Sequence, residues 1–316
     1  MDTTANLLAR RAFLAGAAAL PLRSATQPSN KLPVCAFSKH FQWTTAREAA
    51  QLAAGIGYDA LDLTVRKGGH VLPERVKEDL PKAVEAIRAA GMDAPMITAG
   101  IMDINSPNAE DILKTASSLG IKRYRWGGFR YDTAKPIPQQ ISEFRAMSKD
   151  LAALNRQHGV CAMYHTHSGV GQFGASMWDI WMVLKDLDHD AVSVNLDIAH
   201  ATIEGGLGGW INSSRLLLPV SRGIAIKDFR WEKNAAGKWA VRWCPLGEGM
   251  VNLAEFLKIV KAENFSGPLQ VHMEYRELGG ADAGRPQMSI SRDEFMQYMK
   301  RDIAAIRTLM REAGLA

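Results

Sequence analysis

The chain has 316 residues, 47% of them hydrophobic and 22% charged, and its formal net charge is +5. This length suits one large α/β barrel or two domains. No stretch reaches the ~20 apolar residues that cross a bilayer, so stable membrane insertion is not expected. Lysine and arginine are scattered among acidic residues, which argues against a nucleic-acid partner. Oligomeric state is unreadable from the sequence, and a homo-oligomer is compatible with it.

The three cysteines, Cys35, Cys161 and Cys244, are far apart in the sequence. They lack the CxxC spacing of a thiolate zinc site, and their odd number argues against a disulfide scaffold. We expect them to be small buried side chains.

The N-terminal segment has the layout of an export signal. Arg10 and Arg11 are followed by Phe13, Leu14 and a weakly apolar run rich in alanine. This pattern favours a twin-arginine signal over an amphipathic tail. We therefore assign residues 1–30 to a signal peptide and linker and residues 31–316 to the folded domain. The expected partner of the signal is the twin-arginine export machinery, and the expected location is the periplasm or beyond.

After residue 32, predicted strands and helices alternate along the chain. The strands are expected at 33–38, 58–65, 92–98, 121–127, 160–167, 191–200, 222–229 and 268–275. The helices are expected at 46–57, 73–91, 108–120, 138–159, 176–187, 210–218, 252–267 and 292–313. Pro81 should kink or divide the second helix.

Eight strand-then-helix units of this size predict a single (β/α)8 TIM barrel. The alternative is an open doubly wound sheet, in which a glycine-rich phosphate-binding turn is expected after an early strand. The turn after the first predicted strand reads KHFQW and contains no glycine.

Catalytic residues of such barrels lie at the C-terminal ends of the strands. Those ends are polar here, and they carry Asp62, Arg66, His70, Arg123, Arg125, Trp126, His165, His167, Asp197, His200, Lys227, Asp228, His272 and Glu274. Because side chains alternate along a strand, one arrangement brings His165, Asp197, Lys227 and Glu274 to a common point. Imidazole and carboxylate groups together suit Mn²⁺, Co²⁺, Fe²⁺ or Zn²⁺. The parity of Asp228 turns it away from Lys227 and favours a helix cap.

The chain resembles the xylose isomerase-like barrel superfamily, the sugar phosphate isomerase and epimerase group. The resemblance covers nearly everything after residue 33. Its carriers are YDALDLTVRKGGHVLPE, YHTHSG, LDIAH, IKDFRW, LGEGMVNLAEFLKIVKAENFSGPL and HMEY. The series YHTHSG, LDIAH and IKD is also similar to inosose dehydratase.

The resemblance implies one divalent metal, held by a Glu, an Asp, a His and a Glu on the last four strands. The matching positions here are His165, Asp197, Ala225 and Glu274. Two ligands match, one is replaced and the strand-7 histidine is missing. His200 and His272 are further candidates for the shell.

The implied activity is chemistry next to a sugar carbonyl, with an enediolate as the intermediate. The metal polarises the carbonyl, His165 serves as base or ligand, Glu274 is the second carboxylate and Lys227 steadies the oxyanion. The expected sugar contacts are Arg66, His70, Arg125, Trp126, His167 and His200. Isomerisation or epimerisation is the leading expectation.

Three alternatives stay open at this stage. A keto-sugar or inosose dehydratase, or a keto-glycoside lyase, would use the same enediolate. A non-catalytic exported sugar-binding protein would tolerate alanine at position 225. A metal phosphodiesterase acting on damaged DNA would need a multi-metal cluster and a basic groove, and the mild charge argues against it.

Overall fold

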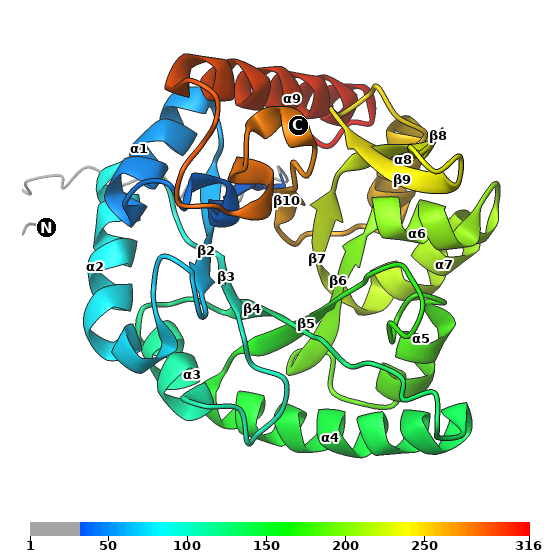
Figure 1. Ribbon diagram of the computed structural model, residues 1–316. Helices are drawn as coiled ribbons and strands as arrows, with labels where there is room; N and C mark the ends of the chain where they lie inside the picture. Colours follow the sequence, from blue (N-terminus) through cyan, green and yellow to red (C-terminus); the bar gives the residue numbers. More distant parts are fainter. Residues whose placement is uncertain (1–31) are drawn as a thin grey trace, which may run out of the picture.

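The computed structural model describes residues 32–316, so the predicted signal at residues 1–30 lies outside the described part of the chain. Parallel strands close a barrel in the order β1-β10-β7-β6-β5-β4-β3-β2, as Figure 1 shows. The barrel strands are β1 (Val34–Phe37), β2 (Ala60–Val65), β3 (Met96–Ala99), β4 (Arg123–Trp126), β5 (Cys161–His165), β6 (Val192–Asp197), β7 (Ser221–Ile226) and β10 (Leu269–Val271). The predicted TIM barrel is confirmed.

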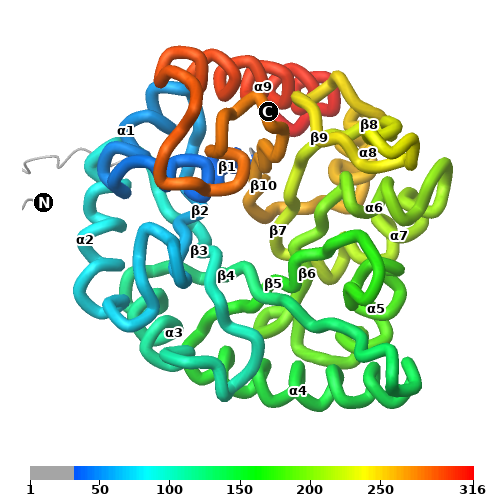
Figure 2. The backbone as a smooth tube through the Cα atoms, in the orientation of Figure 1, coloured from blue at the N-terminus to red at the C-terminus, as the bar shows by residue number. Residues whose placement is uncertain are grey.

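Helices surround the barrel as an outer ring (Figure 2). They are α1 (Ala46–Ile56), α2 (Val76–Ala89), α3 (Ala109–Ser118), α4 (Ile137–His158), α5 (Trp178–Leu184), α6 (Ile198–Gly205), α7 (Gly209–Leu217), α8 (Leu253–Ala262) and α9 (Arg292–Glu312). Short 3-10 helices are η1 (Ser38–Phe41), η2 (Pro73–Arg75), η3 (Leu218–Val220), η4 (Arg276–Leu278) and η5 (Ala281–Ala283). No helix between residues 32 and 316 is long and apolar enough to cross a membrane.

Local sequence signals explain where several helices begin and end. The Thr45 side chain caps α1, and Gly57 ends it in the left-handed conformation that glycine adopts easily. Ser291 and Glu294 form a reciprocal capping box at the start of α9. Pro81 lies inside α2, which runs unbroken from Val76 to Ala89, so the predicted division of this helix is wrong. Proline removes one backbone hydrogen bond, and α2 continues past it.

The structure differs from the predicted elements at four places near the mouth of the barrel. Strand β10 ends at Val271, so His272 and Glu274 lie in the following segment instead of the predicted strand. Strand β5 ends at His165, so His167 lies in the following loop. Strand β6 ends at Asp197, and His200 belongs to α6 instead of the strand. An antiparallel hairpin, β8 (Asp228–Lys233) and β9 (Trp239–Cys244), follows β7 and is absent from the predicted elements.

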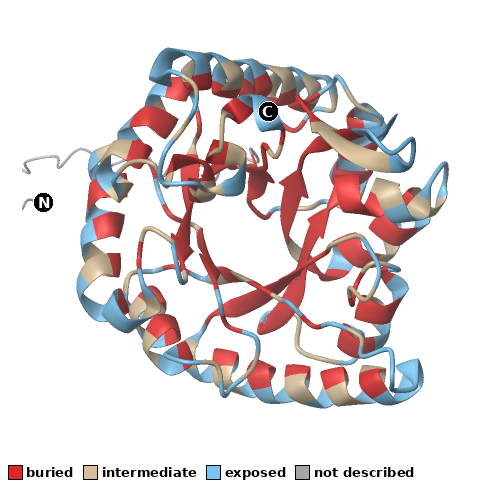
Figure 3. Ribbon diagram, viewed as in Figure 1, coloured by how far each residue is buried: buried red, intermediate tan, exposed pale blue. Residues whose placement is uncertain are grey.

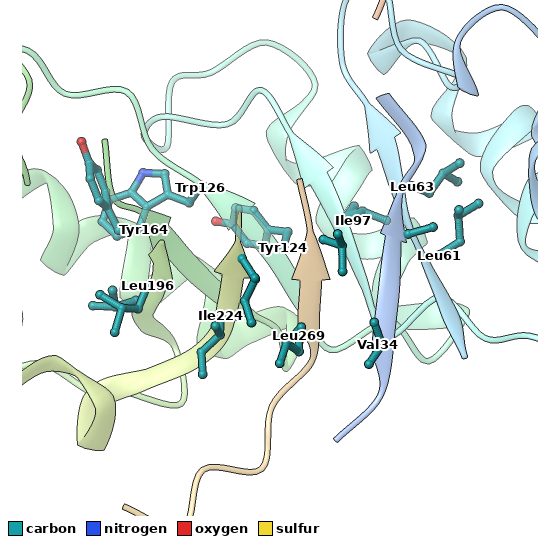
Figure 4. Close-up of a cluster of buried hydrophobic side chains, with 14 of the residues drawn as sticks. Val34, Leu61, Leu63, Ile97, Tyr124, Trp126, Tyr164, Leu196, Ile224 and Leu269 are labelled. Carbon is teal, nitrogen blue, oxygen red and sulfur yellow. The ribbon is translucent and has the colours of Figure 1, made fainter. Parts of the chain in front are cut away.

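The main core lies between the outer face of the barrel and the helices (Figure 3). Figure 4 shows outward-facing side chains of this layer, including Leu61, Leu63, Tyr124 and Leu196. Three cysteines are free and buried, as expected. The lumen, in contrast, carries polar groups: the Asn195 amide donates to Gln270 Oε1 at 2.8 Å. Parallel strands thus bury apolar groups on one face and leave the other for chemistry.

His40 ties the loop after β1 to the loops after β10. Its Nδ1–H donates to the carbonyl of Ala281 at 3.2 Å, and its Nε2 accepts from the Met273 amide at 3.1 Å. The ring is fully buried, and burial is the main cause that lowers the pKa of His40 from 6.5 to about 3. The neutral tautomer therefore satisfies both partners, whereas a second ring proton would face the Met273 amide.

Acid should destabilise the fold through His40. Because the unfolded chain binds a proton on this ring below pH 6.5 while the folded chain does not, the free energy of unfolding falls as the pH falls. The expected contribution is about 1.4 kcal/mol per pH unit. Urea denaturation between roughly pH 4.5 and 6.5 would show a shallower slope in His40→Gln than in the wild type. Equal slopes would contradict this assignment.

Candidate active site

Lys227 is the centre of a polar cluster at the C-terminal mouth of the barrel. Its side chain is 3% exposed and follows β7 directly. Nζ lies 3.3 Å from Asp197 Oδ2, 3.1 Å from Glu274 Oε2 and 2.8 Å from His200 Nε2. The Trp243 ring on β9 lies 4.3 Å from the same nitrogen. Two carboxylates and an aromatic face offset the cost of burying this cation.

Glu274 is the carboxylate of the cluster that solvent reaches. A quarter of its side chain (25%) is exposed, whereas the side chain of Asp197 is fully buried. Its second oxygen accepts from Lys39 Nζ at 3.1 Å. Burial alone would raise the pKa of Glu274, but Lys227 and Lys39 hold it well below its usual value. Glu274 is therefore an ionised carboxylate at the open end of the site.

The two carboxylate oxygens of Asp197 have different surroundings. Oδ1 caps α6 by accepting from the amides of Ala199 at 3.0 Å and His200 at 3.2 Å. Oδ2 has no hydrogen-bond partner among the described residues, and it lies 3.6 Å from His165 Nε2. Burial raises the pKa of Asp197, while Lys227 opposes that shift. The cap fixes the carboxylate so that Oδ2, which is ion-paired with Lys227, also lies beside His165.

His165, Asp197 and His272 bring one ligand atom each within 4.8 Å of one another. His165 Nδ1 and both ring nitrogens of His272 are buried and have no hydrogen-bond partner among the described residues. Burial, aided by Arg125, lowers the pKa of both rings well below the usual value, so both are neutral bases. Unsatisfied buried nitrogens are rare in proteins, and a metal would satisfy them.

A second group with metal-ligand spacing contains His165, His167 and His200. The nitrogens of His200 are already engaged, because its Nδ1 accepts from the Ser168 amide at 3.1 Å and Nε2 faces Lys227. His167 Nδ1 lies 3.1 Å from the carbonyl of His165. The trio of His165, Asp197 and His272 therefore fits a metal better. Two imidazoles and a carboxylate suit Zn²⁺, Mn²⁺, Fe²⁺ or Co²⁺.

The remaining predicted sugar contacts do not all reach this cluster. Arg125 points into the mouth and lies 3.4 Å from His167 Nε2, and Arg66 is placed close to Arg125. Trp126 faces outward, packs on Tyr164 and donates to the carbonyl of Met102 (Figure 4). The structure thus places Trp126 in the core behind the site.

His70 also lies apart from the cluster. Its Nε2 contacts the carbonyl of Phe41 at 3.2 Å and its Nδ1 contacts Thr64 Oγ1 at 3.3 Å. The ring lines a surface cavity of about 250 Å³ between α1 and α2. In this position His70 joins the loops after β1 and β2 instead of facing Lys227.

Two residues of the hairpin complete the surroundings of the site. Trp243, which no sequence pattern singles out, covers Lys227 and makes an edge contact with His200. Asp228, expected to cap a helix, instead fixes both ends of the hairpin, because it accepts hydrogen bonds from the amides of Phe229, Gly247, Gly249 and Val251. The sequence signal for the hairpin is the alternation in FRWEK and WAVRW around the turn residues NAAG.

Comparison with known proteins supports the barrel assignment. The xylose isomerase-like TIM barrel model matches residues 50–302. No curated protein matches the chain at a significant level.

Solved structures of similar fold cover nearly the whole barrel. A xylose isomerase-like protein from Mycobacterium smegmatis in complex with magnesium has a TM-score of 0.63 at 16% identity, covering 90% of this chain and 98% of its own. D-allulose 3-epimerase from Methylomonas, in complex with D-allulose, has a TM-score of 0.63 at 15% identity, covering 88% and 97%. The IOLI protein with a zinc atom has a TM-score of 0.64 at 16% identity, covering 90% and 98%.

At such low identity, the structural neighbours establish the fold alone. The family model, however, spans most of the described barrel, from α1 into α9. This chain therefore belongs to the xylose isomerase-like TIM barrel family.

Proposed function

We propose that the protein is a sugar isomerase or epimerase that removes and returns a proton on the carbon next to a sugar carbonyl. The observation that carries this proposal is the buried Lys227 ammonium, held between Asp197 and Glu274 at the open mouth of the barrel. Membership of the family and the D-allulose 3-epimerase of similar fold support the substrate class.

In the proposed reaction, Glu274 accepts the proton, because it is ionised and exposed to the mouth. The electron pair of the broken C–H bond forms the C=C bond of an enediolate, and the carbonyl oxygen gains a negative charge. Lys227 donates a hydrogen bond to that oxygen, and Trp243 shields the contact from water. Because Glu274 is open to solvent, the proton that it has taken exchanges with water. A proton then returns from Glu274 to a carbon of the enediolate, and the C=O bond forms again.

His165, Asp197 and His272 would hold a divalent metal in this site. Bound there, the metal would act as a Lewis acid that polarises the carbonyl oxygen. The imidazoles are neutral without losing a proton, because burial keeps their pKa values low. Both imidazoles could therefore bind a metal at neutral pH without first releasing a proton.

The first test of this proposal is hydrogen exchange with solvent. The purified protein, incubated with a panel of ketoses in D2O, should incorporate deuterium at the carbon next to the carbonyl, measured by proton NMR. Glu274→Gln should lower the exchange rate by about 10²–10⁴-fold, the usual contribution of a general base. Glu110→Gln, an exposed glutamate on α3, is the matched control and should leave the rate unchanged.

Different products would separate the alternative reactions. Deuterium incorporation with an epimer or isomer supports the proposal. An unsaturated or cleaved product would show elimination, the dehydratase or lyase reaction, and would overturn the isomerase assignment. Sugar binding without exchange on any tested ketose would indicate a non-catalytic binding protein.

Metal content tests the ligand trio. Wild type supplied with Zn²⁺ or Mn²⁺ and then desalted should retain about one ion per chain by elemental analysis. Asp197→Asn and His272→Gln should each weaken metal binding by at least about tenfold. His189→Gln, between β5 and β6, is the matched control and should retain the metal. Loss of metal in Glu274→Gln but not in His272→Gln would instead support the ligands implied by the family resemblance.

We also propose that the protein acts outside the cytoplasm, on the basis of Arg10 and Arg11 in the N-terminal segment. Fractionation of cells that express the full chain tests this proposal. Replacing both arginines with lysine should move the protein from the periplasmic to the cytoplasmic fraction. An unchanged distribution would contradict the export assignment.

A further inference from the structure

The two halves of the barrel mouth carry charge differently. The half built by β5, β6, β7 and β10 pairs its buried cation with carboxylates. The half built by β1 to β4 contains Arg66 and Arg125. Among residues 32–316, neither guanidinium has a carboxylate oxygen within the 4.0 Å of an ion pair, and the one hydrogen bond found for either joins Arg125 to His167. A guanidinium offers five N–H donors, so most of these donors are free.

Asp62 is the carboxylate that acts most strongly on the charge of both arginines, but its hydrogen bonds go to another residue. It is fully buried on β2, and both of its oxygens accept from Thr98 Oγ1, at 3.0 and 2.9 Å. Burial raises the pKa of Asp62 to about 7, against the opposing effects of Thr98 and the two arginines. Burial also lowers the pKa of Arg125 to about 10, which leaves it charged at neutral pH. The arginine half of the mouth therefore keeps a positive excess.

Phe37 connects this positive half to the metal-ligand trio. The guanidinium carbons of Arg66 and Arg125 lie 5.9 and 5.6 Å from the centre of its ring. The same ring stacks on His272 at 4.6 Å. A third cation, Lys39, lies 5.5 Å from the ring, but Glu274 neutralises it. A ligand whose carbonyl lies at the trio would extend past Phe37 toward two unpaired arginines.

We propose that Arg66 and Arg125 bind an anionic group of the substrate, so that the natural sugar is a keto-acid sugar or a sugar phosphate. This inference rests on the proposed function for the position of the carbonyl. A carboxylate and a phosphate each accept two parallel hydrogen bonds from the planar guanidinium group. Both are anions with several acceptor oxygens, and this is the chemistry that the arginines would recognise. The anion would supply the missing counter-charge of the arginine half and would fix the sugar in one direction.

Calorimetry with three six-carbon ketoses tests the proposal in the full-length protein. D-fructose has no anionic group, D-fructuronate has a carboxylate at C6 and D-fructose 6-phosphate has a phosphate there. At least one anionic probe should bind about tenfold or more tightly than D-fructose, the range expected for a hydrogen bond to a charged group. The probe with the larger gain in affinity over D-fructose shows whether the natural substrate carries a carboxylate or a phosphate.

Variants locate the binding site of the anion. Arg66→Gln and Arg125→Gln should each reduce the affinity for the anionic probe more than the affinity for D-fructose, so that the preference for the anion falls. Arg215→Gln, an exposed arginine on α7, is the matched control and should keep the preference. If Arg125→Gln fails to fold, Arg66→Gln still tests the proposal, because Arg66 is partly exposed and its replacement disturbs less packing.

Equal binding of all three probes would overturn the proposal, and so would a preference that both arginine variants retain. These outcomes are separable from failure of the proposed function. Deuterium exchange on neutral ketoses without anion preference would leave the isomerase assignment standing and this inference wrong. Anion preference that depends on Arg66 and Arg125, without deuterium exchange on any ketose, would support this inference and contradict the isomerase assignment.

Discussion

The organisation of the site depends on the burial of one cation, the Lys227 ammonium. A buried ammonium is costly unless counter-charges surround it, and here the carboxylates of Asp197 and Glu274 supply two. The two carboxylates come from the end of β6 and from the loop after β10, and Lys227 itself follows β7. Satisfying one side chain therefore fixes the relative positions of three segments at the mouth, and Asp197 Oδ2 takes its direction from the same ion pair.

Strand periodicity is enough to predict the heart of this cluster. Alternation alone predicts that His165, Asp197, Lys227 and Glu274 converge, and the structure brings them to one mouth. The alternation rule succeeds because every second side chain of each barrel strand points into the lumen. The rule holds even for Glu274, which lies just beyond the end of β10. The same rule, applied to Trp126, turns it outward, since Arg125 beside it points inward.

Other features cannot be predicted because they depend on distant partners. Lys39 reaches Glu274 across 235 positions of the sequence, and His40 reaches Met273 across 233. No local pattern encodes such contacts, since closure of the barrel between β1 and β10 creates them. The helix α6 escapes prediction for a different reason: Asp197 ends a strand and caps a helix at once, so the short sequence LDIAH reads wholly as strand.

The alanine at position 225 shows how the mouth tolerates a missing histidine. Ala225 pairs with Asp197 on one side and with Gln270 on the other, so a methyl group stands between β6 and β10. Gly223, two residues earlier, is smaller still. The rings of His165 and His272 lie beside each other, with their centres 5.3 Å apart. His272, the second imidazole of the trio, comes from the segment after β10, two residues before Glu274, and Lys227 comes directly after β7.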